Sequence, residues 1–171
     1  MKPNIWHRMD VMARRVTPFG LTVLLLFVGL LPIHVPGFAR VAPLFPLMAI
    51  YHWTIIRPDV MPPIAVFAIG LLQDLLTGAP LGVSAAVYLG VYGAVLSQRH
   101  FFLGKSFLII WIGFSLVAAA SGIVSWIIVS VLNLTLLEPS ASFYQYLMTV
   151  SFFPLLAWVF LHWQRAMLST D

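Results

Sequence analysis

GLLQDLLTGAPLG, residues 70–82, is the stretch that decides how this chain folds. It joins two apolar runs, Val60–Leu76 and Leu81–Ser97, through a turn at Thr77–Pro80, where glycine and proline favour a reversal of the chain. Each run is long enough for a helix, and the only charged residue in either is Asp74. We therefore predict two helices joined by a tight turn, with one carboxylate close to that turn.

The composition of the whole chain indicates a membrane protein. Of its 171 residues, 61% are hydrophobic and 8% are charged, and the mean hydropathy is +1.01. A soluble domain has about 25% charged residues, because its surface faces water. The chain has no cysteine, so disulfides, zinc–thiolate sites and cysteine nucleophiles are excluded. These observations predict an all-α protein whose helices cross a membrane several times.

Six apolar runs are predicted to form the transmembrane helices. They are Phe19–Ile33, Val41–Ile56, Val60–Leu76, Leu81–Ser97, Ser106–Leu132 and Phe143–Trp163. The chain then divides into a basic cytoplasmic tail, a six-helix transmembrane domain and a short cytoplasmic tail, at residues 1–18, 19–163 and 164–171. The loops between the runs are too short to hold a soluble catalytic or nucleic-acid-binding domain.

The positive charges predict the orientation of these helices. The N-terminal tail, second loop, fourth loop and C-terminal tail contain Lys2, Arg8, Arg14, Arg15, Arg57, Arg99, Lys105 and Arg165. The first, third and fifth loops contain only Arg40. Because cytoplasmic loops are enriched in Lys and Arg, both termini are predicted to be cytoplasmic. The basic N-terminal tail is either a helix lying on the membrane surface or a frayed tail.

Local signals add three expectations about helix ends and packing. Asp59 is expected to cap the third helix, and Ser142 with Gln145 matches a capping box at the start of the sixth. The fifth run has small residues four apart, as at Ala118 and Gly122. Such spacing lets a neighbouring helix approach closely in a membrane, so we expect tight packing there.

Asp74 is the one carboxylate inside the six runs. A carboxylate in lipid is costly unless it is paired or hydrogen-bonded, and the C-terminal end of a helix disfavours negative charge further. Compensation is expected from Arg40, from His34 or from the free N–H groups that start the fourth helix. Three interpretations stay open: Asp74 fixes the turn, it forms a proton or ligand site, or it faces water at the outer surface.

No catalytic or cofactor motif stands out. A single intramembrane carboxylate cannot form an aspartyl-protease pair, and the serines of the fifth run have no histidine at their depth. The five histidines are spread over the chain, and no glycine-rich phosphate loop is present. We therefore predict no enzymatic activity, no metal or cofactor site and no nucleic-acid partner.

Residues 70–82 fit the pattern G-L-x-x-D-L-x-x-G-x-x-L-G, and a proline-bounded helix precedes them. This combination resembles the family of the bacterial rod shape-determining protein MreD. The resemblance, together with the charge argument for Asp74, gives a set of structural or partner-binding candidates. They are Asp74, Gly70, Gly78, Pro80, Gly82, Arg40, Pro46 and Pro58.

The resemblance implies a non-enzymatic, multi-pass scaffold of the bacterial inner (cytoplasmic) membrane that serves cell elongation. It implies association with an MreC-like bitopic protein, and with MreB filaments, RodA and the elongation transpeptidase. The family is also similar in fold to the substrate-binding subunits of energy-coupling-factor transporters. The alternative function is therefore a small-molecule-binding membrane subunit of that type. Such a subunit needs convergent polar groups, whereas the polar residues of the runs are scattered along the sequence, which favours the scaffold.

Overall fold

The chain folds into helices throughout the part that the structure, a computed structural model, describes. The backbone is described for residues 5–31, 41–136 and 138–168, and the side chains for residues 17–31, 41–136 and 138–163. The helices are α1 (Ile5–Gly29), α3 (Phe45–Ile56), η1 (Pro58–Val60), α4 (Pro63–Thr77), α5 (Val83–Ser97), α6 (Arg99–Phe102), α7 (Phe107–Asn133) and α8 (Pro139–Leu168). These ranges contain no strand. The all-α prediction is confirmed, and each apolar run corresponds to one of α1, α3, α4, α5, α7 and α8.

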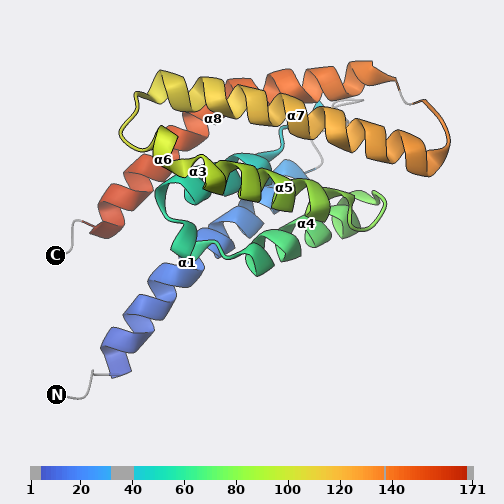
Figure 1. Cartoon of the computed structure of the whole chain (residues 1–171). Helices are drawn as coiled ribbons and strands as arrows, with labels where there is room; N and C mark the ends of the chain where they lie inside the picture. The colour runs from blue at the N-terminus through green and yellow to red at the C-terminus, as the bar shows by residue number, and fades with distance from the viewer. Residues whose placement is uncertain (1–4, 32–40, 137, 169–171) are drawn as a thin grey trace.

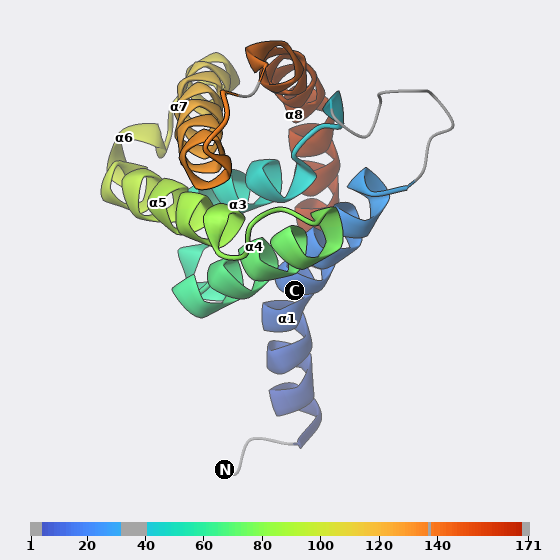
Figure 2. The same cartoon turned by 90° about the vertical axis from the view of Figure 1, so that its right-hand side faces the viewer.

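The six main helices run alternately between two ends of the molecule. In Figure 1 the α4–α5 and α7–α8 connections lie at one end, and the α3–α4 and α5–α7 connections lie at the other, together with the start of α1 and the end of α8. Figure 2 shows α3 and α5 between α1 and α4 on one side and α7 with the first part of α8 on the other. The helix α3 is central, since it packs against α1, α5, α7 and α8.

The burial of α3 explains its composition. Every residue from Pro46 to Ile55 is buried, so this helix is apolar on all sides rather than on one face. Tyr51 lies at its middle and packs edge-on against the rings of Phe102, Phe114 and Phe153, which come from α6, α7 and α8. Its hydroxyl donates a hydrogen bond of 2.9 Å to the carbonyl of Ile110. One buried tyrosine therefore joins four helices.

The C-terminal end of α3 is held by Arg99. Its Nε donates to the carbonyl of Ile55 at 2.8 Å, and its Nη2 donates to the carbonyl of Ile56 at 3.4 Å. A guanidinium suits this place, because the last carbonyls of a helix lack partners and carry partial negative charge. In the sequence, Arg99 contributes only a positive charge to the predicted orientation, and its contact with the end of α3 was not predicted.

We expect Arg99→Ala to lower the free energy of unfolding by about 1–2 kcal/mol, because hydrogen bonds to charged groups are worth more than neutral ones. Arg57→Ala is the matched control: it removes the same charge from the same end of the molecule. Within the described part of the chain, the Arg57 side chain makes an exposed ion pair of 3.6 Å with Asp59, so we expect its loss to cost less than about 1 kcal/mol. Thermal unfolding in mild detergent compares the two. Equal destabilisation would show that Arg99 acts through its charge alone.

Among the residues with described side chains, two helices are long and apolar enough to cross a membrane, α7 over Phe107–Asn133 and α8 over Pro139–Trp163. The other apolar helical segments there, including Thr17–Gly29 of α1, are shorter, at 10–17 residues. A 12- to 15-residue helix is about 18–23 Å long, against a hydrocarbon core of about 30 Å. Large apolar side chains on α7 are well exposed, including Leu116, Ile123 and Val131. These surfaces suit contact with lipid.

Two expected helix starts are wrong. The helix α4 begins at Pro63 with Pro62 at its N-cap, and Asp59 lies earlier, in η1. The helix α8 begins at Pro139, one turn before the expected capping box. Gln145 is therefore inside the helix, where its Nε2 donates to the carbonyl of Ala42 at 3.0 Å. In both places proline starts the helix, because its fixed φ and missing N–H suit the first turn.

The first helix does not break where the basic tail was expected to end. The helix α1 is continuous from Ile5 to Gly29 and has Pro18 inside it. A helical backbone from Ile5 agrees with a helix rather than a frayed tail, and the position of this segment on the membrane surface stays a prediction. His34 and Arg40 lie outside the described residues.

Candidate functional site

Asp74 connects the end of α4 to the start of α5. Its side chain is fully buried. The Gly82 amide donates to Oδ2 at 2.8 Å, and the Ser84 amide donates to Oδ1 and Oδ2 at 3.1 and 3.2 Å. The helix α5 has Gly82 at its N-cap and therefore no capping side chain of its own. The carboxylate of one helix thus caps the next, where free N–H groups and the helix dipole both favour negative charge.

The turn between the two helices depends on glycine at two positions. Gly78 ends α4 with φ +70°, and Gly82 precedes α5 with φ +96°. Both values lie in the left-handed region, which side chains with a Cβ seldom adopt. Pro80 lies between them, and its carbonyl accepts from the Val83 amide at 3.3 Å. These three residues of the sequence pattern therefore shape the path that brings Gly82 and Ser84 to Asp74.

Gly70 lies one helical turn before Asp74 and lets α4 and α5 touch. A Cβ at this position would be 2.4 Å from the Ala85 Cα and 2.6 Å from the Ala85 amide nitrogen. Only hydrogen fits there, because both opposing atoms belong to the backbone. Gly70 and Asp74, four residues apart on one helix face, thus hold the same neighbour by close contact and by capping.

The close packing expected in the fifth helix is found at Ala118, which is buried, but not at Gly122. A Cβ at Gly122 would meet nothing within 4 Å, so no neighbouring helix approaches there. Small residues four apart permit close packing, but they do not say which helix will supply the partner surface. In α7 the tight position is Gly113 instead, where a Cβ would lie 2.5 Å from the Phe102 ring and 2.8 Å from the Tyr51 hydroxyl.

The two prolines that bound the preceding helix occupy helix starts. Pro46 is in the first turn of α3 and is buried, and Pro58 begins η1. Neither position needs an N–H for an intrahelical hydrogen bond. They lie on α3 and the segment after it, and the hydrogen bonds of Asp74 go to Gly82 and Ser84 instead.

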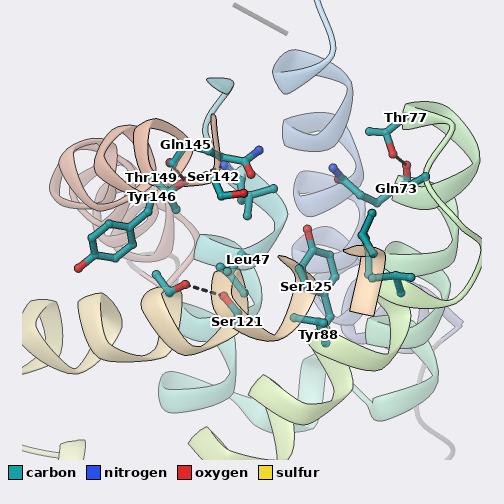
Figure 3. Close-up of a pocket in the computed structure, with 18 residues that line it drawn as sticks. Leu47, Gln73, Thr77, Tyr88, Ser121, Ser125, Ser142, Gln145, Tyr146 and Thr149 are labelled. Atoms are coloured by element: carbon teal, nitrogen blue, oxygen red, sulfur yellow. Dashed lines mark hydrogen bonds between the residues drawn. The ribbon is translucent and has the colours of Figure 1, made fainter. Parts of the chain in front are cut away.

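A cavity of about 270 Å³ lies between α3, α4, α5, α7 and α8, and Figure 3 shows its lining. We call it the polar cavity. Its polar lining residues are Gln73, Thr77, Ser84, Tyr88, Ser121, Ser125, Ser142, Gln145, Tyr146 and Thr149. None of the described lining residues is Lys, Arg, Asp or Glu. These residues are scattered along the sequence, but the fold gathers them around one space, so the expectation that they would not converge is wrong.

The polar cavity is held in shape by hydrogen bonds from α8. Gln145 and Thr149, one turn apart, contact the segment before α3: Gln145 donates to Ala42, and the Leu44 amide donates to the Thr149 hydroxyl at 3.1 Å. Among the residues with described side chains, no three His, Asp or Glu gather as metal ligands would. The cavity is therefore a neutral space of amides and hydroxyls.

These features define the class: an all-α membrane protein whose fourth and fifth helices are joined by a glycine-shaped turn with a buried carboxylate. A family model described as "rod shape-determining protein MreD" matches residues 9–166. The chain belongs to this family, and its role is in the determination of rod shape. Searches of curated proteins and of solved structures find no match to the chain.

Proposed function

We propose that this chain is a non-enzymatic, multi-pass scaffold of the bacterial inner membrane that binds an MreC-like bitopic protein and positions the enzymes of cell elongation. The observation that carries the proposal is the family match over residues 9–166. MreB filaments, RodA and the elongation transpeptidase are further partners in this proposal. The buried carboxylate is engaged by the α5 backbone, which suits a structural role rather than catalysis.

The partner is proposed to bind an apolar helix face rather than a loop. The α4–α5 and α7–α8 connections are too short to bury the about 800 Å² per partner that a stable interface needs. The helix α7 offers a long surface instead, since Leu116 is 69% exposed and Ile123 is 59% exposed. These residues are seven apart and therefore lie on one helix face.

Site-specific cross-linking tests this surface. A photoreactive amino acid at Leu116 or Ile123 should trap the bitopic partner in membranes of a rod-shaped host. The matched control is Ile64, which is 76% exposed and belongs to α4, a helix that Figure 2 shows on the other side of α3 and α5 from α7. Cross-linking of the partner at Ile64 and not at either α7 position would move the interface away from α7.

Cell shape tests the function itself. Depletion should give rounded or swollen cells, because lateral wall synthesis loses a positioning subunit. Affinity purification in mild detergent should recover the bitopic partner. Rod-shaped growth at the normal rate after clean deletion in a rod-shaped host would contradict the proposal.

The proposed topology places both termini in the cytoplasm. It is supported by the uneven charge distribution and by the alternating direction of the helices in Figure 1. Reporter fusions after Asp171 should be active only with a cytoplasmic reporter, and fusions within residues 133–141 only with an exported one. An exported C-terminus would exclude an even number of spans.

A second candidate is a small-molecule-binding subunit of the energy-coupling-factor type. The polar cavity favours it, since uncharged polar groups from four helices converge there. Purification with the ATP-hydrolysing subunits of such a transporter, in place of a bitopic partner, would favour this second function.

A further inference from the structure

The polar cavity contains a hydroxyl that lacks a partner. Tyr88 is 3% exposed, and its hydroxyl has no hydrogen-bond partner within the described residues. Figure 3 shows this ring among the lining side chains, with its hydroxyl toward the space between Gln73 and the α8 residues. A buried polar group without a partner is destabilising, because its hydrogen bonds to water are lost and not replaced. A hydrogen-bonding ligand in the cavity would remove that cost.

The polar cavity adjoins an apolar space between α7 and α8. This second space, which we call the α7–α8 groove, has a volume of about 300 Å³. Its lining includes Ala119, Ile123, Trp126 and Phe143, and its polar surface is small. Three residues line both spaces: Gly122, Ser142 and Tyr146. Because Gly122 has no side chain and nothing near its Cβ position, it leaves this boundary open.

We propose that the two spaces together bind one lipid that has an uncharged, hydroxyl-bearing headgroup. The headgroup lies in the polar cavity, where Tyr88 and the amides Gln73 and Gln145 can donate and accept hydrogen bonds. The acyl chain leaves past Gly122 and lies in the α7–α8 groove.

Charge and position determine this choice of ligand. Among the described residues, no Lys or Arg lines either space, so a phosphate headgroup would bury its charge there without a cation from any of them. The groove faces the surface that suits lipid, since Ile123 and Phe143 on its wall are 59% and 57% exposed. A free polyol has the same hydroxyl chemistry as the headgroup and would fill the polar cavity, but it has no chain to occupy the groove. An experiment can therefore distinguish a lipid from a free polyol.

Native mass spectrometry of the full chain tests the proposal. The protein is placed in dioleoylphosphatidylcholine nanodiscs with equal small fractions of dioleoylglycerol and dioleoylphosphatidylglycerol, which share their chains and differ in head charge. We expect dioleoylglycerol to stay bound above its bulk fraction and dioleoylphosphatidylglycerol not to. Tyr88→Phe should weaken retention about three- to tenfold, because it removes one neutral hydrogen bond.

Two glycine variants test the path of the chain. Gly122→Leu should abolish retention by filling the boundary between the two spaces. Gly90→Leu is the matched control, since Gly90 is exposed on α5 with open space around it and lines a different groove. Thermal unfolding identifies any variant that misfolds. If Gly122→Leu misfolds, the retention of dioleoylglycerol by Tyr88→Phe tests the proposal by itself.

Three results would overturn the proposal. Equal enrichment of the neutral and anionic lipids, or of neither, would remove the headgroup preference. Full retention by Gly122→Leu or by Tyr88→Phe would place the lipid elsewhere. Stabilisation of the detergent-solubilised protein by glycerol at the same concentration as by dioctanoylglycerol would assign the cavity to a free polar molecule.

Discussion

Replacement of Gly70 by alanine should remove most of the folded protein from the membrane. The new Cβ would lie 2.4 Å from the Ala85 Cα, so α4 and α5 must separate. Rearrangement of a packed interior costs about 1–3 kcal/mol and occasionally more. We expect the upper end of that range or beyond, because the opposing atoms are backbone and cannot rotate away. The same separation would move the α5 amides away from Asp74.

Gly90 and Gly93 supply matched controls for this prediction. Both are helical glycines on α5, and a Cβ at either would meet nothing within 4 Å. Alanine there should be neutral or should stabilise the protein by about 0.5–1 kcal/mol, because alanine favours helix more than glycine does. Membrane abundance and thermal unfolding in detergent compare the variants. Similar behaviour of Gly70→Ala and Gly90→Ala would contradict the close contact.

A second-site change separates this explanation from side-chain crowding. Since the contacts of Gly70 are with the Cα and amide nitrogen of Ala85, removal of the Ala85 methyl group cannot relieve them. The double variant Gly70→Ala with Ala85→Gly should therefore be at least as unstable as Gly70→Ala alone. Rescue would show that α4 and α5 meet through side chains.

The six main helices of the described residues were predictable, because each apolar run is bounded by proline, glycine or charged residues, whereas the short η1 and α6 were not predicted. The residues at which the helices start were less predictable. Asp59 and Ser142 have suitable side chains for capping, but Pro63 and Pro139 begin the helices, since their fixed φ needs no side-chain partner. The central position of α3 could not be predicted either, because an apolar run has the same composition whether its helix faces lipid or protein.

The candidate site was predictable only where its residues are close in sequence. Asp74 and the start of the next helix are joined by one turn, so their proximity follows from the sequence alone. The polar cavity is different: Gln73 and Gln145 are on α4 and α8 and come together only in the folded chain. The contact of Gly70 with Ala85 likewise depends on how α4 and α5 cross, which spacing of small residues does not determine.

Asp74→Leu should destabilise the protein far more than Asp74→Asn. Leucine leaves the amides of Gly82 and Ser84 without an acceptor in a buried place, at about 1–3 kcal/mol for each. Asparagine keeps an oxygen, and one oxygen position suffices: Oδ2 accepts from Gly82 at 2.8 Å and from Ser84 at 3.2 Å. It also removes a negative charge from the C-terminal end of α4, where the helix dipole opposes it.

Protein abundance and rescue of rod shape in a depletion strain distinguish the two interpretations of Asp74. If the carboxylate fixes the turn, Asp74→Asn should keep most of the abundance and rescue, and Asp74→Leu should lose both. If the carboxylate carries protons or binds a ligand by its charge, the variants should reach normal abundance and fail equally to rescue. Gln73→Leu is the control for a loss of polarity in the cavity wall. Gln73 is the residue before Asp74 and lines the cavity, but the Gly82 and Ser84 amides donate to Asp74. Arg40→Ala tests whether a cation is a second partner of the carboxylate, beside the capping amides. If it is, Arg40→Ala should lower the protein abundance as much as Asp74→Leu does. The double variant Arg40→Ala with Asp74→Asn should then be destabilised by less than the sum of the two single variants.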